Sequence, residues 1–191
     1  MITGPRQVGK STLIEELGRK GQLQYEKVTL DDPHERYLAK TDPQLFLESH
    51  KVPLFIDEFQ YATELLPYIK MAVDKRTMTN NLDASGLFIL TSSQMFKMMS
   101  DVSESLAGRV GILNLFSLSS NEIYGNKEDC FLPAFANLKK RENNTRLGLA
   151  ELYNSFISGS MPRMHLGLNI NPSIFYSEYT QTYLEKDIKS F

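Results

Sequence analysis

The sequence predicts an α/β domain with a parallel β-sheet, followed by a shorter helical segment. Up to Leu118, short apolar runs alternate with longer stretches of helical periodicity, which is the pattern of strands joined by covering helices. After Leu118 the helical periodicity continues, but no convincing strand is present. The 191 residues, 41% of them hydrophobic, suffice to bury the core of one such domain. We therefore expect an α/β core over residues 1–118 and a helical segment over residues 119–191.

The expected strands follow from apolar runs that turn-forming residues interrupt. Residues 1–3 form a strand stub before a glycine, and residues 25–30 form a strand that Asp31, Asp32 and Pro33 end. Continuous apolar runs, as expected for strands buried on both faces, occupy residues 52–56 and 87–90, and residues 110–115 form the last strand.

The expected helices follow from apolar residues three and four positions apart, with helix breakers at their ends. In residues 10–20, Leu13, Ile14 and Leu17 share one face, and Gly21 follows. Similar patterns predict helices over residues 33–40, 43–49, 65–75, 94–100 and 103–107 in the core, and over residues 119–124, 147–157 and 174–188 after it. The polar residues 127–144 show no pattern of either kind.

Composition and charge exclude several classes of protein. The formal net charge is −2, so no global positive field draws the chain to nucleic acid or anionic lipid. Cys130 is the single cysteine, which excludes an intrachain disulfide and fits a cytoplasmic location. Because no run of about 18 apolar residues and no signal-peptide pattern occurs, no membrane-spanning helix is expected.

The chain carries a phosphate-binding loop near its N-terminus. Residues 4–11, GPRQVGKS, match G-x-x-x-x-G-K-[ST] at every fixed position, between a strand stub and a periodic helix. In such a loop Lys10 reaches the β- and γ-phosphates of a nucleoside triphosphate, and the Ser11 hydroxyl coordinates Mg²⁺. This context favours a P-loop for ATP and Mg²⁺ over a glycine-rich turn that caps a helix. The residues expected at the nucleotide are Gly4, Pro5, Arg6, Gln7, Val8, Gly9, Lys10, Ser11 and Thr12.

Two acidic residues follow the third expected strand. Asp57 and Glu58 end the apolar run VPLFI, which is the Walker B arrangement. In an open parallel sheet this strand end lies beside the P-loop. There Asp57 would hold Mg²⁺ through its water shell, and Glu58 would polarise a water for in-line attack on the γ-phosphorus. The alternative is a surface acidic pair at a strand exit.

Small polar residues follow the fourth expected strand. Thr91, Ser92 and Ser93 come directly after the run LFIL, where their hydroxyls can contact the γ-phosphate or orient water. Thr91 is the preferred candidate and Ser93 the second. The alternative is that Ser92 or Ser93 caps the helix that begins at Gln94.

An arginine precedes the last expected strand. Arg109 stands between a helical turn and the run from Val110. A guanidinium at this place can reach the nucleotide of a neighbouring subunit and stabilise charge on the γ-phosphate. The alternative is a structural salt bridge at the start of the strand.

Together these residues resemble a known family. The segments GPRQVGKSTL, LFIDEFQ, LFILTSSQ and SESLAGRVGILNLFSLSSNEI resemble the AAA+ ATPase domain of a bacterial and archaeal group. Members of this group are usually described only as ATP-binding proteins or predicted ATPases, and longer members carry a C-terminal domain of unknown function. The resemblance continues through residues 159–162 and 183–187, so it extends over nearly the whole chain.

The resemblance implies a P-loop NTPase fold of AAA+ type, with five parallel strands in the order 5-1-4-3-2 and a small helical lid. It supports the Walker roles of Lys10, Ser11, Asp57 and Glu58, and it makes a functional Arg109 more plausible. Thr91 or Ser93 would occupy the position called sensor 1. Two departures stand out: Ser92 replaces a usual glycine, and residues 159–162, GSMP, replace a common Gly-Gly-aromatic-Pro.

Two features favour a piece of a longer protein over a genuinely short version of it. Only three residues precede Gly4, so the first strand is shorter than usual. The chain also ends near the point where the C-terminal domain of the family would begin. We therefore expect residues 1–118 to be the ATPase core with a truncated first strand. Residues 119–191 would be the lid and the start of a linker.

Three functions compete at this stage. The leading one is an ATPase that switches or drives an unidentified partner, which is a protein or a nucleic acid. No membrane partner is expected, and the chain can form a homo-oligomer. The second is a small-molecule kinase, in which Asp31 or Asp32 serves the acceptor, although a water-activating Glu58 argues against it. The third is a nucleotide-binding module that does not hydrolyse.

Overall fold

The computed structural model describes residues 1–80, 85–94, 101–102, 104–125 and 147–183. The chain divides into two compact units, Met1–Phe116 and Ser117–Phe191, and each is described by itself. The expected helix over residues 94–100 and the polar stretch 127–144 lie outside the described residues, apart from Gln94.

The first unit is built on a five-stranded parallel sheet. Its strands are β1 (Ile2–Thr3), β2 (Glu26–Thr29), β3 (Leu54–Asp57), β4 (Phe88–Ser92) and β5 (Leu113–Asn114). Their order across the sheet is β2-β3-β4-β1-β5, and every pair is parallel. Read from the β5 edge, this is the expected order 5-1-4-3-2. Because all strands run the same way, the segments that leave β1, β3 and β4 lie at one edge of the sheet.

Helices follow the strands as the sequence predicts. They are α1 (Lys10–Arg19), α2 (Pro33–Thr41), α3 (Pro43–Ser49) and α4 (Leu66–Asn80), with 3₁₀ turns η1 (Phe59–Tyr61) and η2 (Thr63–Leu65) between β3 and α4. An Asp-Pro step begins both α2 and α3. The Asp32 and Asp42 carboxylates accept the backbone N–H groups of His34 and Leu45, and proline occupies the first turn.

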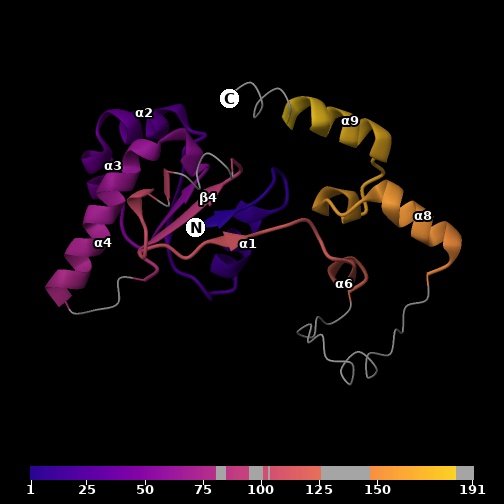
Figure 1. Ribbon diagram of the computed structural model, residues 1–191, viewed down its shortest axis with the longest axis horizontal. Helices are drawn as coiled ribbons and strands as arrows, with labels where there is room; N and C mark the ends of the chain where they lie inside the picture. The colour runs from indigo at the N-terminus through magenta and orange to yellow at the C-terminus, as the bar shows by residue number, and fades with distance from the viewer. Residues whose placement is uncertain (81–84, 95–100, 103, 126–146, 184–191) are drawn as a thin grey trace, which may run out of the picture. The chain divides into compact units, whose positions relative to one another are not determined.

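The sheet is covered on both faces, and β3 shows this directly. Leu54 and Ile56 belong to the larger apolar cluster, which also contains Phe46 of α3 and Ile69 of α4. Phe55 points to the other face and packs with Ile2 and Ile14 in a smaller cluster under α1. Figure 1 shows α2, α3 and α4 stacked along one side of the sheet. All three β3 side chains are fully buried, which stabilises the fold by about 1.5–3 kcal/mol each.

Several boundaries differ from the predicted ones. β3 begins at Leu54 rather than residue 52, because Pro53 has no N–H to donate to a neighbouring strand. β4 extends through Ser92, so Thr91 is part of the strand. α4 runs to Asn80 rather than to residue 75. β5 has two residues instead of six, because its partner β1 is itself only two residues long.

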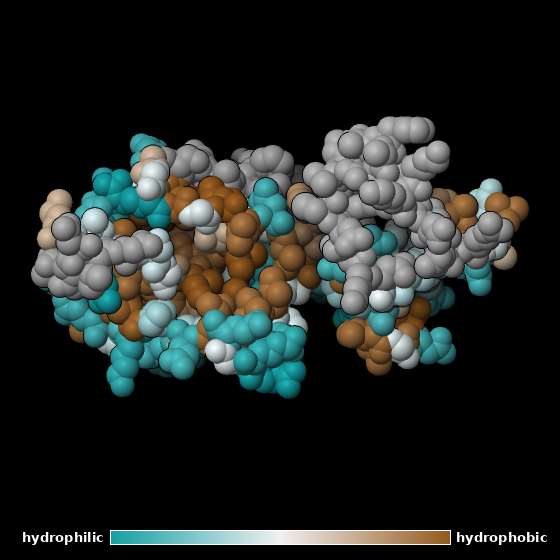
Figure 2. Space-filling model, turned by 90° about the horizontal axis from the view of Figure 1, so that it is seen from below, coloured by the Kyte–Doolittle hydropathy of each residue, from teal (hydrophilic) through white to brown (hydrophobic). Residues whose placement is uncertain are grey.

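The second unit consists of α6 (Ser120–Ile123), α8 (Leu149–Ser158), the 3₁₀ turn η3 (Pro162–His165) and α9 (Pro172–Tyr183). Tyr176 of α9 donates to the Ser158 carbonyl oxygen at 2.8 Å, which ties α9 to the end of α8. Gly159 allows this contact, because a Cβ atom there would lie 2.2 Å from the Tyr176 hydroxyl oxygen. α8 carries several exposed apolar side chains, and Figure 2 shows apolar surface on both units. Within the described residues, no helix has the length and apolarity needed to span a membrane.

Candidate nucleotide-binding site

The loop between β1 and α1 has the backbone geometry that its two fixed glycines allow. At Gly4 a Cβ atom would lie 2.0 Å from the Leu115 carbonyl oxygen, so only glycine fits beside the chain after β5. Gly9 has φ 96° and is the residue before the first turn of α1. No described atom lies within 4 Å of where its Cβ would be. The positive φ of Gly9 lies directly before the N-terminus of α1, and a helix N-terminus suits an anion.

Lys10 points back into this loop. Its side chain is only 6% exposed, and Nζ donates to the carbonyl oxygens of Gly4 at 2.9 Å and Pro5 at 2.8 Å. Burial lowers the pKa of the Lys10 ammonium, and the nearby negative charge of Glu58 opposes this shift. A buried ammonium group whose hydrogen bonds go to neutral carbonyl oxygens can bind an anionic ligand favourably.

The other residues expected at the nucleotide line the same turn at different depths. Val8 is buried, Ser11 is half-buried, and Thr12 is exposed on α1. Gln7 is exposed and has φ 62°, a conformation that is uncommon outside glycine. The remaining two, Pro5 and Arg6, are half-buried.

Three segments far apart in the sequence meet at one carboxylate oxygen. Oδ1 of Asp57 accepts a hydrogen bond from Ser11 Oγ at 2.7 Å and another from Thr91 Oγ1. Asp57 is buried at the end of β3, and Thr91 is buried within β4. The structure thus brings together the P-loop serine, the first acid after β3 and the preferred polar residue of β4.

A hydroxyl and a carboxylate are ligands that Mg²⁺ accepts, so the donor set fits this ion. Within the described residues, no group of three or more His, Cys, Asp or Glu side chains could hold a metal ion. The site therefore fits an ion held jointly by one or two protein oxygens and phosphate groups, rather than by a protein cage.

Glu58 lies beside this cluster in a constrained backbone conformation. It has φ 54° and ψ 44°, which is left-handed and unusual for a glutamate. Its N–H donates to Asp57 Oδ1 at 3.2 Å and to Thr91 Oγ1 at 3.3 Å. Its side-chain oxygen Oε2 accepts hydrogen bonds from Gln60 Nε2 and from Ser93 Oγ, the latter at 3.4 Å. Backbone and side chain are thus both held in place.

The sequence pattern predicts no role for Gln60, although this residue ends the segment LFIDEFQ. Its position two residues after Glu58 is the only signal that the sequence offers. The two serines after Thr91 separate in the structure: Ser93 joins Gln60 and Glu58, whereas Ser92 Oγ accepts the N–H of Gln94 at 3.2 Å. The helix that either serine would cap lies outside the described residues, so the capping alternative stays a prediction.

Arg109 is not brought to the P-loop of its own chain. It lies ahead of β5 and pairs with Asp74 of α4, with Nε 2.6 Å from Oδ1 and Nη2 3.2 Å from Oδ2. Arg109 lowers the pKa of the Asp74 carboxyl through these hydrogen bonds. Both residues line a cavity of about 640 Å³ with Met1 and Phe88, at the starts of β1 and β4. Within one chain, Arg109 therefore forms a salt bridge, as the structural alternative predicts.

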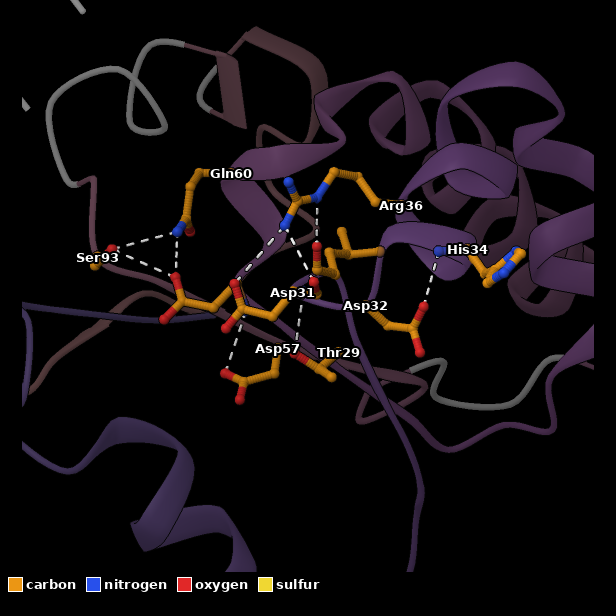
Figure 3. A network of polar contacts seen from close by, with 10 residues as sticks. Thr29, Asp31, Asp32, His34, Arg36, Asp57, Gln60 and Ser93 are labelled. Atoms are coloured by element: carbon orange, nitrogen blue, oxygen red, sulfur yellow. Dashed lines mark hydrogen bonds and ion pairs between the residues drawn. The ribbon is translucent and has the colours of Figure 1, made fainter. Parts of the chain in front are cut away.

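The two acids after β2 have structural contacts of their own. Asp32 caps α2 through the His34 N–H. Arg36 donates to the carbonyl oxygens of Leu30 at 2.6 Å and Asp31 at 3.3 Å, and its guanidinium lies 3.8 Å from the Asp31 carboxylate. Figure 3 shows these contacts beside Asp57, Gln60 and Ser93. Neither acid joins the cluster at Asp57 through a described hydrogen bond, so no contact favours the kinase reading.

Comparison with protein families shows a match over most of the chain. A family model described as "AAA domain" matches residues 1–124 of the 191. The matched range includes the P-loop, Asp57, Glu58, Thr91 and Arg109.

Comparison with curated proteins gives relatives whose function is not described. The chain is 29% identical over 130 residues to uncharacterized proteins of Mycobacterium bovis and Mycobacterium tuberculosis. The aligned region covers 68% of this chain and 27% of each relative. The chain thus spans about a quarter of the length of these relatives.

Proposed function

The chain belongs to the AAA domain family, and from this premise we propose that it binds ATP with Mg²⁺ and hydrolyses it to ADP and phosphate. Family membership supports a nucleotide-binding ATPase module. The observation that carries the proposal is the cluster at Asp57 Oδ1, where Ser11 of the P-loop and Thr91 of β4 converge. A P-loop NTPase needs metal-binding and phosphate-sensing groups close together, and these three residues would supply them.

In the binding step, the amides of residues 4–11 and the start of α1 would surround the β- and γ-phosphates. Lys10 would exchange the Gly4 and Pro5 carbonyl oxygens for phosphate oxygens, which form stronger, charge-assisted hydrogen bonds. Its buried charge would gain a counter-charge, so the cost of its burial is offset on binding.

Ser11 would bind the magnesium ion directly, and Asp57 would hold it through a water ligand. Magnesium, when bound, neutralises charge that develops on the phosphate oxygens. The existing hydrogen bond from Ser11 to Asp57 keeps these two oxygens 2.7 Å apart. Thr91 would keep the carboxylate of Asp57 oriented, because it donates to the same oxygen.

In the hydrolytic step, Glu58 would accept a proton from water while the water oxygen attacks the γ-phosphorus. The bond from phosphorus to the terminal oxygen of ADP breaks, and phosphate leaves. Glu58 suits this role because hydrogen bonds fix its backbone and its side chain.

Phosphate release from ATP and Mg²⁺, measured without any added acceptor, tests the proposal. We expect steady release by the full chain, and a loss of about 10²-fold or more in Glu58→Gln with ATP binding retained. Turnover that requires a small-molecule acceptor would support the kinase alternative. Binding without release would support a non-hydrolysing module. Full turnover in Glu58→Gln would contradict the role of Glu58 as base.

Arg109 enters this proposal only through a second copy of the chain, because within its own chain it pairs with Asp74. A guanidinium from a neighbour would stabilise charge on the γ-phosphate. Specific activity should then rise with protein concentration. A mixture of Arg109→Ala and Lys10→Ala proteins should recover part of the lost activity. Activity that is independent of concentration would rule out this role.

We further propose that residues 119–191 act as a helical lid and as the start of a linker to a further domain. The partner that ATP turnover would switch or drive remains to be identified, as a protein or a nucleic acid. Fusing or co-expressing the region that flanks this chain in longer relatives, and measuring phosphate release, would test whether that region responds to ATP.

A further inference from the structure

Glu58, Gln60 and Ser93 form a closed triangle of hydrogen bonds, hereafter the Gln60 triangle. Gln60 lies in η1 and Ser93 lies directly after β4. Gln60 Nε2 donates to Glu58 Oε2 and, at 3.2 Å, to Ser93 Oγ, while Ser93 Oγ donates to Glu58 Oε2 at 3.4 Å. Figure 3 shows Gln60 and Ser93 pointing to the same carboxylate.

The chemistry of these contacts fixes the orientation of the Gln60 amide. An ionised carboxylate oxygen only accepts hydrogen bonds, so the amide must turn its nitrogen toward Glu58. Its oxygen Oε1 then faces away from Glu58. This oxygen is buried and has no hydrogen-bond partner among the described residues. A buried amide oxygen without a donor is costly, so the contact of the amide nitrogen with Glu58 is made at the expense of the amide oxygen.

The Gln60 amide is not needed to hold the backbone of Glu58. The left-handed conformation of Glu58 is supported by its own N–H, which donates to Asp57 Oδ1 and Thr91 Oγ1. Gln60 instead acts on the end of the Glu58 side chain, where proton transfer would occur. A role limited to local folding therefore leaves the contact of its amide nitrogen and the burial of its amide oxygen unexplained.

We propose that Gln60 is a positioning residue, which holds the Glu58 carboxylate in the orientation that activates water. The inference rests on the proposed hydrolysis of ATP. The amide nitrogen donates to Oε2 of Glu58 and to Ser93 Oγ. A proton of the attacking water passes to Glu58 as the water oxygen bonds to the γ-phosphorus and the bond to ADP breaks.

Gln60→Met tests the proposal by removing both polar groups at nearly constant side-chain length. In the full chain, kcat for phosphate release should fall about tenfold or more, while KM for ATP should stay unchanged. Gln44→Met is the matched control, because Gln44 also donates to a glutamate, Glu48, at 2.8 Å, but on α3. This control should keep the kcat of the unmodified chain. Unchanged kcat in Gln60→Met would overturn the proposal.

Gln60→Glu tests the same contact by charge. An ionised carboxylate at position 60 cannot donate to Glu58 Oε2. The kcat for phosphate release should therefore fall about tenfold or more, with KM for ATP unchanged. Unchanged kcat would overturn the proposal. Because glutamate keeps the shape of glutamine, this variant also decides the question if Gln60→Met fails to fold.

A readout without turnover separates this inference from the proposed function. Mg²⁺, ADP and aluminium fluoride together mimic the in-line transition state, including the attacking water. The gain in unfolding temperature from this mixture over Mg²⁺ and ADP alone should shrink in Gln60→Met and persist in Gln44→Met. An equal gain in both variants would overturn the role of Gln60. If the unmodified chain released no phosphate, the proposed hydrolysis itself would fail. Phosphate release by the unmodified chain, together with an equal gain in both variants, would refute the role of Gln60 alone.

Discussion

The two edges of the sheet in the first unit differ in chemistry. At the edge where the strands end, Ser11, Asp57 and Thr91 share one carboxylate oxygen, and Lys10 is buried beside them. At the edge where the strands begin, a cavity of about 640 Å³ is lined largely by apolar side chains. The side chains of the Asp74–Arg109 ion pair, which line that cavity, are each about one-third exposed.

The volume of a cavity therefore does not by itself identify the proposed site. Ligand sites combine a concave surface with a few convergent polar groups, and here such groups converge from three separate segments. The ion pair at the other edge is ordinary surface chemistry, which contributes little to stability. We therefore expect substitutions at the two edges to have unequal effects on ATP binding and turnover, even where the residue types match.

Asp57→Asn and Asp74→Asn compare the edges with the same substitution. Asp57→Asn should lower the affinity for Mg²⁺, so the Mg²⁺ concentration needed for half-maximal phosphate release should rise about 10- to 100-fold. Loss of a group that orients a metal site has this effect. Asp74→Asn should leave the Mg²⁺ requirement unchanged. Phosphate release titrated with Mg²⁺ measures both. Equal Mg²⁺ requirements in the two variants would remove the distinction between the edges.

Thr91→Val and Thr77→Val provide a second matched pair, with a smaller expected effect. Thr91 Oγ1 orients Asp57, whereas Thr77 Oγ1 donates only to the Val73 carbonyl oxygen of its own helix, at 3.1 Å. Thr91→Val should lower turnover about tenfold, and Thr77→Val should leave it unchanged. Steady-state kcat for phosphate release measures the difference. Wild-type turnover in Thr91→Val would show that the hydrogen bond to Asp57 is dispensable.

The affinity for ATP should depend on pH through Lys10. Burial lowers the pKa of its ammonium below 10.5, so the free protein loses this positive charge at a lower pH than an exposed lysine does. Phosphate favours the charged form. Affinity should therefore fall as pH rises through the lowered pKa, and in Lys10→Ala this slope should vanish. Calorimetric titrations with ATP and Mg²⁺ over a pH series would measure it. An identical slope in both proteins would assign the effect to another group.

Arg109→Ala should have the smallest effect on a single chain. The affinity for ATP should stay unchanged, and the unfolding temperature should fall only slightly, because the ion pair is solvent-exposed. Since Arg109 lowers the pKa of Asp74, the stability that this pair contributes is present above the ordinary aspartate pKa. It is lost as pH falls through the lowered one. Thermal unfolding at neutral and acidic pH checks this, and a loss of ATP affinity would contradict the placement of Arg109 away from the site.

Much of the fold could be predicted from local patterns. The two Asp-Pro steps begin α2 and α3, and the run from Leu54 to Ile56 is a strand buried on both faces. Lengths were predicted less well. The extent of β5 is set by its two-residue partner β1, and pairing between distant segments leaves no local signal in the sequence.

Some residues of the candidate site could be predicted from the sequence, and others could not. The P-loop, Asp57 and Glu58 lie within short motifs whose spacing follows from phosphate chemistry, so the sequence points to them directly. Gln60 could not be singled out, because its role depends on Ser93, which is 33 residues away and approaches only when β3 and β4 pair. Arg109 shows the converse: its place before the last strand suggested chemistry, but its partner Asp74 could not be identified from spacing.

We propose that ATP binds at the buried polar edge of the sheet, and not in the apolar cavity at the opposite edge. Calorimetric titration of the full chain with ATP and Mg²⁺, beside Lys10→Ala, tests this most directly. We predict saturable binding to the unmodified chain. Lys10→Ala should bind about 10- to 100-fold more weakly, the equivalent of about 1.5–3 kcal/mol for a hydrogen bond to a charged group. Equal affinity in the two proteins, or no binding to either, would contradict the account.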